Sequence, residues 1–149
     1  MEIVTNSYEE TIATGREIAD SLRAPMLVLL SGDLGSGKTM LTKGIISGLG
    51  AAKEEDVTSP TFTLVHVFQN PGKFKVYHVD LYRVENFQGL ESLGLEDALS
   101  EQAIVIIEWS ERFTFRSDWP RIEIHLEHEG GDSRRIAMSG FQFGLQGST

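Results

Sequence analysis

The sequence of 149 residues contains no cysteine, no long apolar run and few basic residues. Without cysteine, the chain forms no disulfide, thiolate metal site or cysteine nucleophile. No apolar run approaches the roughly 18 residues of a membrane-spanning helix, and the acidic, polar start MEIVTNSYEE is unlike a signal peptide. We therefore expect a soluble, cytoplasmic protein that does not bind a membrane.

The charge balance disfavours direct, tight binding to nucleic acid. Lys and Arg number 13 against 22 Asp and Glu, which gives a net charge of -9 that repels a polyanion. Hydrophobic residues nevertheless make up 40% of the chain and include 8 Phe, 3 Tyr and 2 Trp, enough for the core of one globular domain. We expect that domain to span residues 1–140, followed by a flexible tail at 141–149.

The apolar pattern of the first third predicts a helix, a strand and a second helix. The first helix is expected at about 8–22, and the continuously apolar run at 26–30 is typical of a strand covered on both faces in a parallel sheet. A glycine-rich turn at 32–37 then leads into a helix at 38–49, which Gly50 closes as a C-terminal cap. Strand, glycine loop and helix thus follow one another directly.

The rest of the chain adds β-rich segments and a short helix. The run at 103–107 is apolar on both faces and predicts a second central strand. The alternation at 121–127 is typical of a strand with one exposed face. Turn residues between two β-rich runs predict a hairpin. The remaining expected elements are the hairpin arms at 62–68 and 74–82, a short helix within 90–99 and a last strand near 134–138.

Residues 32–39, GDLGSGKT, match the pattern G-x-x-x-x-G-K-[ST] of a phosphate-binding loop. Their position between a buried strand and a helix suits phosphate binding, because the loop amides and the helix N-terminus then point at one spot. Lys38 would reach the β- and γ-phosphates, and the Thr39 hydroxyl would coordinate Mg²⁺. A glycine turn that only caps a helix is the alternative. The residues expected to contact a nucleotide here are Asp33, Leu34, Gly35, Ser36, Gly37, Lys38, Thr39 and Met40.

Two acidic residues follow predicted strands, which is where a nucleoside triphosphatase of this class holds its metal. Glu108 follows the more completely apolar run, so we expect it to bind Mg²⁺, whereas Asp80 would hold a metal-bound water or orient the attacking one. For either residue, an ordinary surface carboxylate at a strand end is the alternative. The sequence thus predicts an α/β, P-loop NTPase-like, three-layer fold with a mainly parallel central sheet and an antiparallel β-hairpin extension.

Two neighbouring segments carry weaker signals. The stretch TSPT at 58–61 lies between the loop helix and the hairpin, where a switch could sense a γ-phosphate, but the same residues occur in ordinary turns. Trp109 could stack on a base and Arg112 could neutralise phosphate charge. A core or rim tryptophan and a solvated arginine fit the sequence equally well.

The four histidines predict no metal site. His125 and His128 are three residues apart on a predicted strand and are therefore expected on opposite faces. His66 and His78 lie on the two hairpin arms, where cross-strand or packing roles are typical.

The base and the reaction are less specified than the phosphate contacts. Guanine recognition usually requires an N/T-K-x-D element, which the chain lacks, so adenine is favoured. A small-molecule kinase is one alternative, although the chain has no Arg-rich helical insertion that could form a lid. A nucleotide-dependent binding module with negligible turnover is another.

Four segments together resemble the bacterial TsaE family, the ATPase component of tRNA threonylcarbamoyladenosine biosynthesis. The resemblance covers roughly residues 7–137 and is far more specific than the glycine loop alone. The segments, in the order and at the spacing of the family, are GDLGSGKT at 32–39, TSPTF at 58–62, HVDLYR at 78–83 and IEWSER at 107–112.

The resemblance implies roles for individual residues and for partners. It implies that Thr61 is a switch residue sensing the γ-phosphate, that Asp80 is a catalytic or metal-shell acid and that Glu108 belongs to a Mg²⁺ site. It further implies a cytoplasmic protein that hydrolyses ATP and works with TsaD and TsaB, which transfer the threonylcarbamoyl group to adenosine 37 of tRNAs decoding ANN codons. The tRNA would be contacted only through that complex, in agreement with the acidic charge.

The protein is expected to be a slow ATPase in isolation. The loop at 58–62 lies in a polar stretch with few apolar anchors before it, so its contacts with a γ-phosphate should be incomplete until a partner orders it.

Overall fold

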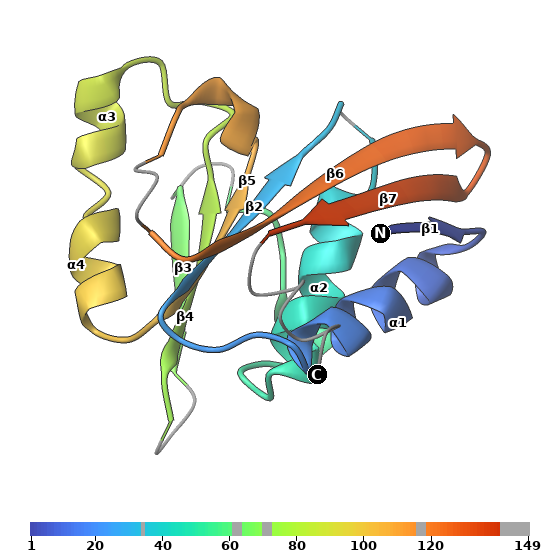
Figure 1. The fold of residues 1–149 in the computed structure, drawn as a ribbon, viewed down its shortest axis with the longest axis horizontal. Helices are drawn as coiled ribbons and strands as arrows, with labels where there is room; N and C mark the ends of the chain where they lie inside the picture. The colour runs from blue at the N-terminus through green and yellow to red at the C-terminus, as the bar shows by residue number, and fades with distance from the viewer. Residues whose placement is uncertain (34, 61–63, 70–72, 116–118, 141–149) are drawn as a thin grey trace.

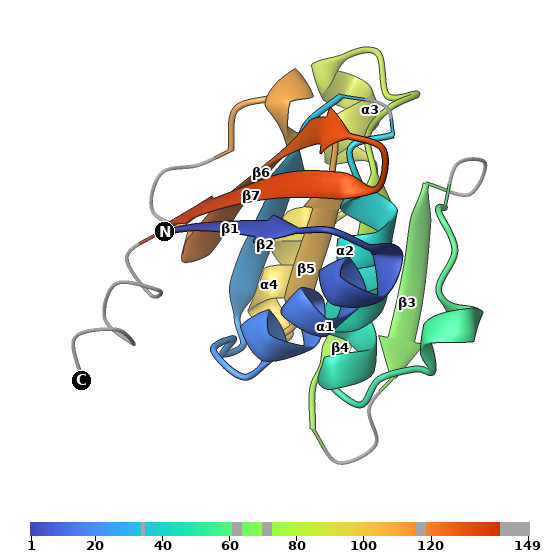
Figure 2. The same ribbon diagram turned by 90° about the vertical axis from the view of Figure 1, so that its right-hand side faces the viewer.

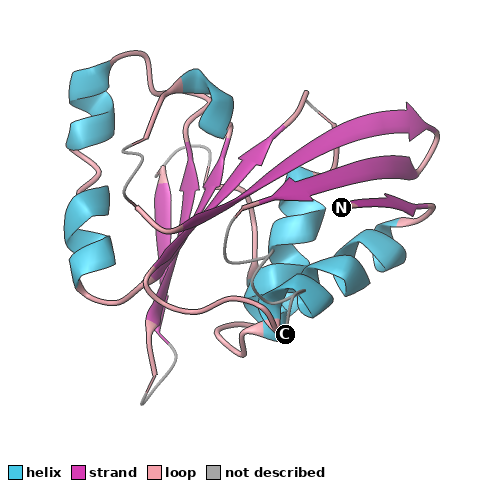
Figure 3. Ribbon diagram, in the orientation of Figure 1, coloured by secondary structure: helices cyan, strands magenta, loops and turns pink. Residues whose placement is uncertain are grey.

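The computed structural model describes residues 1–33, 35–60, 64–69, 73–115 and 119–140. Within these residues, a seven-stranded sheet lies between two pairs of helices, which gives the three layers that the sequence predicts (Figure 1, Figure 3). On one face lie the helices α1 (Tyr8–Ala19) and α2 (Lys38–Gly48), and on the other lie α3 (Phe87–Glu91) and α4 (Leu95–Ser100).

None of the described helices is both long enough and apolar enough to cross a bilayer.

The sheet combines a parallel centre with antiparallel margins. Its strands are β1 (Glu2–Thr5), β2 (Met26–Ser31), β3 (Val65–Gln69), β4 (Lys75–Asp80), β5 (Ile104–Glu108), β6 (Arg121–Gly130) and β7 (Ser133–Ser139). In space they run β1, β7, β6, β2, β5, β4, β3, and the four central strands from β6 to β4 are parallel. The expected hairpin is confirmed as β3 and β4. A second antiparallel margin, β7 with β1, extends the sheet beyond β6.

The two runs that are apolar on both faces form the middle of the sheet, as predicted. β2 and β5 are adjacent and parallel, with Met26 opposite Ile104 and Leu30 opposite Glu108. One face of these strands packs against α1 and α2, and the other packs against α3 and α4. Each strand therefore alternates between two cores. β6 shows the predicted alternation of buried apolar and exposed polar side chains at 121–127.

The helix α1 begins where the sequence predicts and ends earlier. The Ser7 hydroxyl accepts a hydrogen bond from the amide of Glu10 at 3.1 Å, while the Glu10 carboxylate accepts one from the amide of Asn6 at 3.0 Å. These contacts satisfy amides that a helix start leaves without partners. After Ala19 the backbone hydrogen bonds close tighter turns of three residues, so the helix stops there rather than near residue 22.

Left-handed glycines end or divide the other helices. Gly50 has φ of 76° after α2, which confirms it as the C-terminal cap. The single short helix expected within 90–99 is instead two helices, because Gly94 between them adopts φ of 70°. A glycine takes this conformation without the steric cost that a Cβ imposes. The expected tail at 141–149 lies outside the described residues.

The helices α1 and α2 pack backbone against backbone on one face of the sheet (Figure 2). A Cβ at Gly15 would overlap the carbonyl oxygen of Leu41, and a Cβ at Gly44 would overlap that of Ile12. The close approach therefore requires glycine at both positions. Since the glycine loop runs directly into the first turn of α2, this contact also fixes the position of the loop.

Gly44→Ala should lower the free energy of unfolding by about 1–3 kcal/mol, because the added methyl group meets rigid backbone rather than a flexible side chain. The loss is expected although alanine favours a helix over glycine by about 1 kcal/mol. Urea denaturation followed by circular dichroism measures it. Glu17→Ala, on the exposed side of α1, is the control and should change the value by no more than about 0.5 kcal/mol. An unchanged stability for Gly44→Ala would contradict the backbone contact.

Candidate functional site

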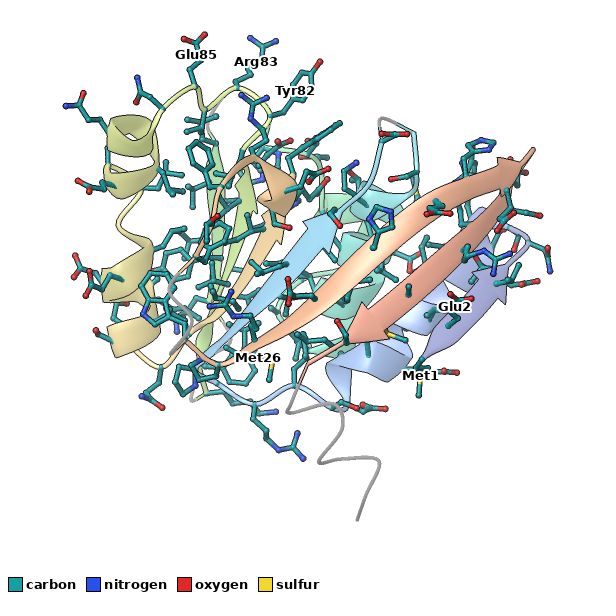
Figure 4. All side chains as sticks on the ribbon, turned by 45° about the horizontal axis from the view of Figure 1, so that its top comes forward. Met1, Glu2, Met26, Tyr82, Arg83 and Glu85 are labelled. Carbon is teal, nitrogen blue, oxygen red and sulfur yellow. The ribbon has the colours of Figure 1, made fainter. Side chains whose placement is uncertain are left out.

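A cavity of about 470 Å³ opens beside the first turn of α2, at the carboxyl ends of β4 and β5. Figure 4 shows Tyr82, Arg83 and Glu85 at this end of the sheet, in the segment that follows β4. Two predicted residues, Leu34 and Thr61, lie outside the described part of the chain. The predicted residues that line the cavity are Gly35, Ser36, Gly37, Lys38, Thr39, Met40, Asp80, Glu108 and Trp109.

Glycine conformations let the loop turn back from β2 into α2. Gly35 and Gly37 have φ of 80° and 102°, which residues with a side chain rarely adopt. In contrast to α1, which Ser7 caps, α2 starts at Gly37 without a hydrogen bond from a described side chain. The amides of its first turn have no acceptor within the helix. They are therefore available to an anion in the cavity.

Lys38 is held inside the site by the loop that precedes it. Its Nζ donates to the carbonyl oxygens of Gly32 and Asp33 at 2.5 and 2.9 Å and lies 3.4 Å from the Ser36 hydroxyl. The amine also lies 3.9 Å from the centre of the Trp109 ring, within the range of a cation–π contact. Lys38 is only 5% exposed, so its charge is directed into the cavity rather than to bulk water.

Burial and nearby carboxylates act in opposite directions on the charge of Lys38. Burial has the larger effect and lowers the pKa of Lys38 from its ordinary value. Four acidic residues around the amine partly offset this effect: Glu108, Glu111, Asp33 and Asp80. Phosphate oxygens at the place of these carbonyl acceptors would add an opposite charge on the acceptor and so strengthen the hydrogen bonds of Lys38.

Thr39, in the first turn of α2, meets Glu108, at the end of β5. The Thr39 hydroxyl donates to Glu108 Oε1 at 3.0 Å, and Glu108 is 2% exposed. Mg²⁺ prefers oxygen ligands and usually takes only one or two carboxylates, with water and substrate phosphates completing its shell. This pair of oxygen groups therefore fits Mg²⁺, although the described residues contain no cluster of three or more His, Asp or Glu that could hold a metal by itself.

Asp80 lies next to Glu108 because the parallel strands β4 and β5 pair these two residues. Its Oδ2 accepts a hydrogen bond from the Ser59 hydroxyl at 2.9 Å, and its Oδ1 accepts one from the amide of Tyr82 at 2.8 Å. A carboxylate has about four acceptor positions, so Asp80 can also accept from a water molecule in the cavity. Ser59 belongs to the predicted switch segment, which is thereby tied to the site.

Aromatic side chains form one wall of the cavity. The rings of Trp109 and Tyr82 lie 4.9 Å apart between centroids and are tilted by 45°. Trp109 adopts φ of 64°, a strained conformation for a residue with a large side chain, of the kind that clusters at functional sites. Arg112 does not line the cavity. It donates to the carbonyl oxygen of Val84 at 3.1 Å, which does not support its predicted contact with phosphate.

Residues at the site that escape prediction from the sequence include Arg134, Tyr8 and Glu111. Arg134 and Tyr8 line the cavity, and Glu111 accepts a hydrogen bond from the amide of Gly32 at 3.1 Å. Arg134 is 6% exposed, and its Nε has no hydrogen-bond partner among the described residues. The same nitrogen lies close to Gly37, 3.5 Å from where a Cβ on that glycine would be. No local pattern reveals Arg134 or Tyr8, because long-range packing brings them to the loop. Glu111 does fall within the segment IEWSER.

The histidines behave largely as predicted. His66 and His78 pair across the hairpin, with ring centroids 6.3 Å apart. His125 and His128 are both exposed and have separate hydrogen-bond partners, so they share no site. The sequence does not predict that Nε2 of His78 lies 2.5 Å from Oε2 of Glu108, with both side chains buried.

Comparisons with known proteins point to one family. The family model described as "Threonylcarbamoyl adenosine biosynthesis protein TsaE" matches residues 5–136. The tRNA threonylcarbamoyladenosine biosynthesis protein TsaE of Bacillus subtilis is 35% identical over 135 residues, 91% of this chain and 82% of that protein. The protein of the same name from Rickettsia prowazekii is 38% identical over 122 residues, 82% of this chain and 83% of its own.

A solved structure agrees with these sequence matches. The crystal structure of YdiB from Bacillus subtilis superimposes with a TM-score of 0.71 and 29% sequence identity, and the match covers 94% of this chain and 84% of that one. The likeness thus extends over nearly the whole chain.

Arg134→Gln should weaken the binding of ADP about tenfold to a hundredfold. The structure directs a buried guanidinium at the phosphate-binding loop, and a hydrogen bond to a charged group contributes about 1.5–3 kcal/mol. Isothermal titration calorimetry measures the affinity.

Arg135→Gln is the matched control, because Arg135 is the next residue of β7 and pairs with Glu2 and Glu129 away from the cavity. It should bind ADP as the unmodified protein does. Equal affinities for the two variants would mean that Arg134 does not contact the nucleotide.

Proposed function

This chain belongs to the TsaE family of threonylcarbamoyl adenosine biosynthesis proteins, and we propose that within that process it is the Mg²⁺-dependent component that binds and hydrolyses ATP. The observation that carries the proposal is the contact between Thr39 and Glu108 beside Lys38. It joins a hydroxyl, a carboxylate and a cation at the uncapped start of α2, which is the combination that a metal-bound triphosphate requires.

The residues of the cavity divide the work of binding and hydrolysis. The first-turn amides of α2 and the amine of Lys38 bind the phosphates, while Thr39 and Glu108 hold Mg²⁺. When bound, the ion neutralises part of the phosphate charge and of the charge that develops on the leaving oxygen. Asp80 accepts a hydrogen bond from the attacking water and so orients it toward the γ-phosphate.

The cavity also offers contacts for the nucleoside. Tyr8 lines it with an aromatic ring, and Arg134 lines it beside Gly37 of the loop. Trp109 lies nearer the phosphates, because its ring is 3.9 Å from the amine of Lys38. We therefore place the base and ribose toward Tyr8 and Arg134, and the triphosphate over the first turn of α2. Stacking alone does not distinguish adenine from guanine, so the preference for ATP rests on the missing N/T-K-x-D element.

We propose that the protein acts on the TsaD–TsaB pair, which modifies adenosine 37 of tRNAs decoding ANN codons, and contacts tRNA only through that complex. The net charge of -9 disfavours direct binding to RNA and favours binding to a basic surface of a protein partner. The hydrogen bond from Ser59 to Asp80 would couple partner binding to the cavity, because a partner that holds the segment around Ser59 also holds a residue of the cavity.

Alanine substitutions of the two acids should reduce turnover in different ways. Glu108→Ala should weaken the affinity for Mg²⁺ and ATP together by about tenfold or more, because it removes a metal ligand. Asp80→Ala should lower kcat by about a hundredfold or more with nearly unchanged affinity, because it removes only the contact to water. Phosphate release and calorimetric titration measure the two effects.

Two further variants serve as the positive and negative controls of this experiment. Lys38→Ala should abolish productive ATP binding, whereas Glu123→Ala, an exposed carboxylate on β6, should leave both measurements unchanged. Equal losses of affinity in Glu108→Ala and Asp80→Ala would refute the division of roles. ATP binding without any phosphate release, alone or with TsaD and TsaB, would instead indicate a binding module.

ATP should tighten the complex with TsaD and TsaB relative to ADP, because a γ-phosphate that interacts with the switch segment is linked to whatever binds that segment. Ser59→Ala should reduce the difference between the two nucleotides by breaking the contact with Asp80. Calorimetric titration of the partner pair into the protein with each nucleotide measures the linkage, and higher salt should weaken both complexes. Indistinguishable affinities with ATP and ADP would remove the switch from the proposal.

A further inference from the structure

His78 occupies a position that a packing residue does not need. Its side chain is fully buried on β4, on the same face of the sheet as Asp80 and directly below the cavity. Its register partners are Ile106 on β5 and His66 on β3. A histidine buried among apolar residues loses its contacts with water, so its ring nitrogens must find partners in the protein.

The partner of His78 is the carboxylate of Glu108. Nε2 of His78 lies 2.5 Å from Oε2 of Glu108, and the two side chains are 0% and 3% exposed. Because an ionised carboxylate only accepts hydrogen bonds, Nε2 must carry the hydrogen in this contact. Nδ1 has no hydrogen-bond partner among the described residues, so the polar contact of the ring is the one through Nε2.

Each carboxylate oxygen of Glu108 therefore has a different hydrogen-bond partner. Oε2 faces His78 below the site, and Oε1 faces the Thr39 hydroxyl at the start of α2. Rotation about the last side-chain torsion of a glutamate is broad, so packing alone does not fix the plane of its carboxylate. A hydrogen bond from a ring that is itself immobile does fix it. His78 is such a ring, because its side chain is fully buried.

We propose that His78 is a positioning residue for the metal site: it holds Glu108 so that Oε1 and the Thr39 hydroxyl face the place of the Mg²⁺ ion. This inference rests on the proposed function, because it assigns a role within the same site. His78 contacts neither nucleotide nor metal and acts through Glu108 alone. Asp80, two residues further along β4, has its own donors in Ser59 and the amide of Tyr82.

Variants at position 78 show whether Glu108 needs a hydrogen-bond donor there or only a side chain that fills the space. His78→Leu fills the position without a hydrogen-bond donor. His78→Gln keeps an amide N–H near the place of Nε2, whereas the shorter His78→Asn does not reach Glu108. His66→Leu is the matched control, because His66 is the cross-strand neighbour of His78 and does not contact Glu108.

The measurement is the affinity for ADP, by calorimetry, once with Mg²⁺ and once with a chelator. The ratio of the two affinities reports the metal site without reference to turnover. We expect His78→Leu and His78→Asn to lose about tenfold to a hundredfold of the tightening that Mg²⁺ produces, with the affinity in chelator unchanged. His78→Gln should retain most of the tightening, and His66→Leu all of it. In a Glu108→Ala background, the change at position 78 should have no further effect.

The outcomes distinguish this inference from the proposed function. If the unmodified protein binds ADP more tightly with Mg²⁺ and His78→Leu and His78→Asn do so equally well, His78 does not position Glu108. Loss of the tightening in His78→Gln to the same extent as in His78→Leu would also overturn the inference, because the donor would then be irrelevant. If Mg²⁺ does not change the ADP affinity of the unmodified protein, the metal site itself is refuted, and the role of His78 with it.

Discussion

The parallel pairing of β2 with β5 is the contact on which the site depends. It sets Leu30 opposite Glu108, so the strand that leads into the glycine loop ends beside the strand that ends in Glu108, the acid proposed to bind Mg²⁺. Parallel strands need a crossover rather than a tight turn, and the chain between them forms α2, the hairpin and the helices of the other face. Both strands must be apolar on both faces for this arrangement, because helices cover the sheet on each side.

The electrostatics of the cavity explain why a metal belongs in the proposed function. Asp80, Glu108, Glu111 and Asp33 all act on Lys38, in a protein that is acidic overall. Lys38, Arg134 and the first-turn amides of α2 do not balance these carboxylates and a triphosphate together. A divalent cation held by Glu108 and Thr39 would supply the missing positive charge. The same carboxylates partly offset the effect of burial, which lowers the pKa of Lys38 from its ordinary value.

Residues whose role follows from local pattern could be predicted, and residues placed by long-range packing could not. The loop at 32–39 can be predicted from its spaced motif, and Asp80 and Glu108 from their places after β-rich runs. The cavity brings together residues 35–39, Asp80 and Glu108, whereas the predicted nucleotide contact Asp33 does not line it. Arg134 and Tyr8 reach the same cavity only because β7 pairs with β6 and α1 crosses α2. The division of the helix within 90–99 depended on the conformation of Gly94, which apolar spacing does not encode.

The carboxylates of Asp80 and Glu108 differ in what holds them, although they lie side by side on neighbouring strands. Glu108 is held by hydrogen bonds with the buried ring of His78 on β4 and with the hydroxyl of Thr39 on α2. Because all three residues belong to regular strands or a helix, Glu108 moves only if these elements move. Asp80 is fixed by Ser59, which belongs to a connecting segment, and by a backbone amide that follows its own strand. Connecting segments open at lower free energy than the strands of a core. Of the two acids, Asp80 is therefore the one that a protein bound at the surface can move, while Glu108 stays in place.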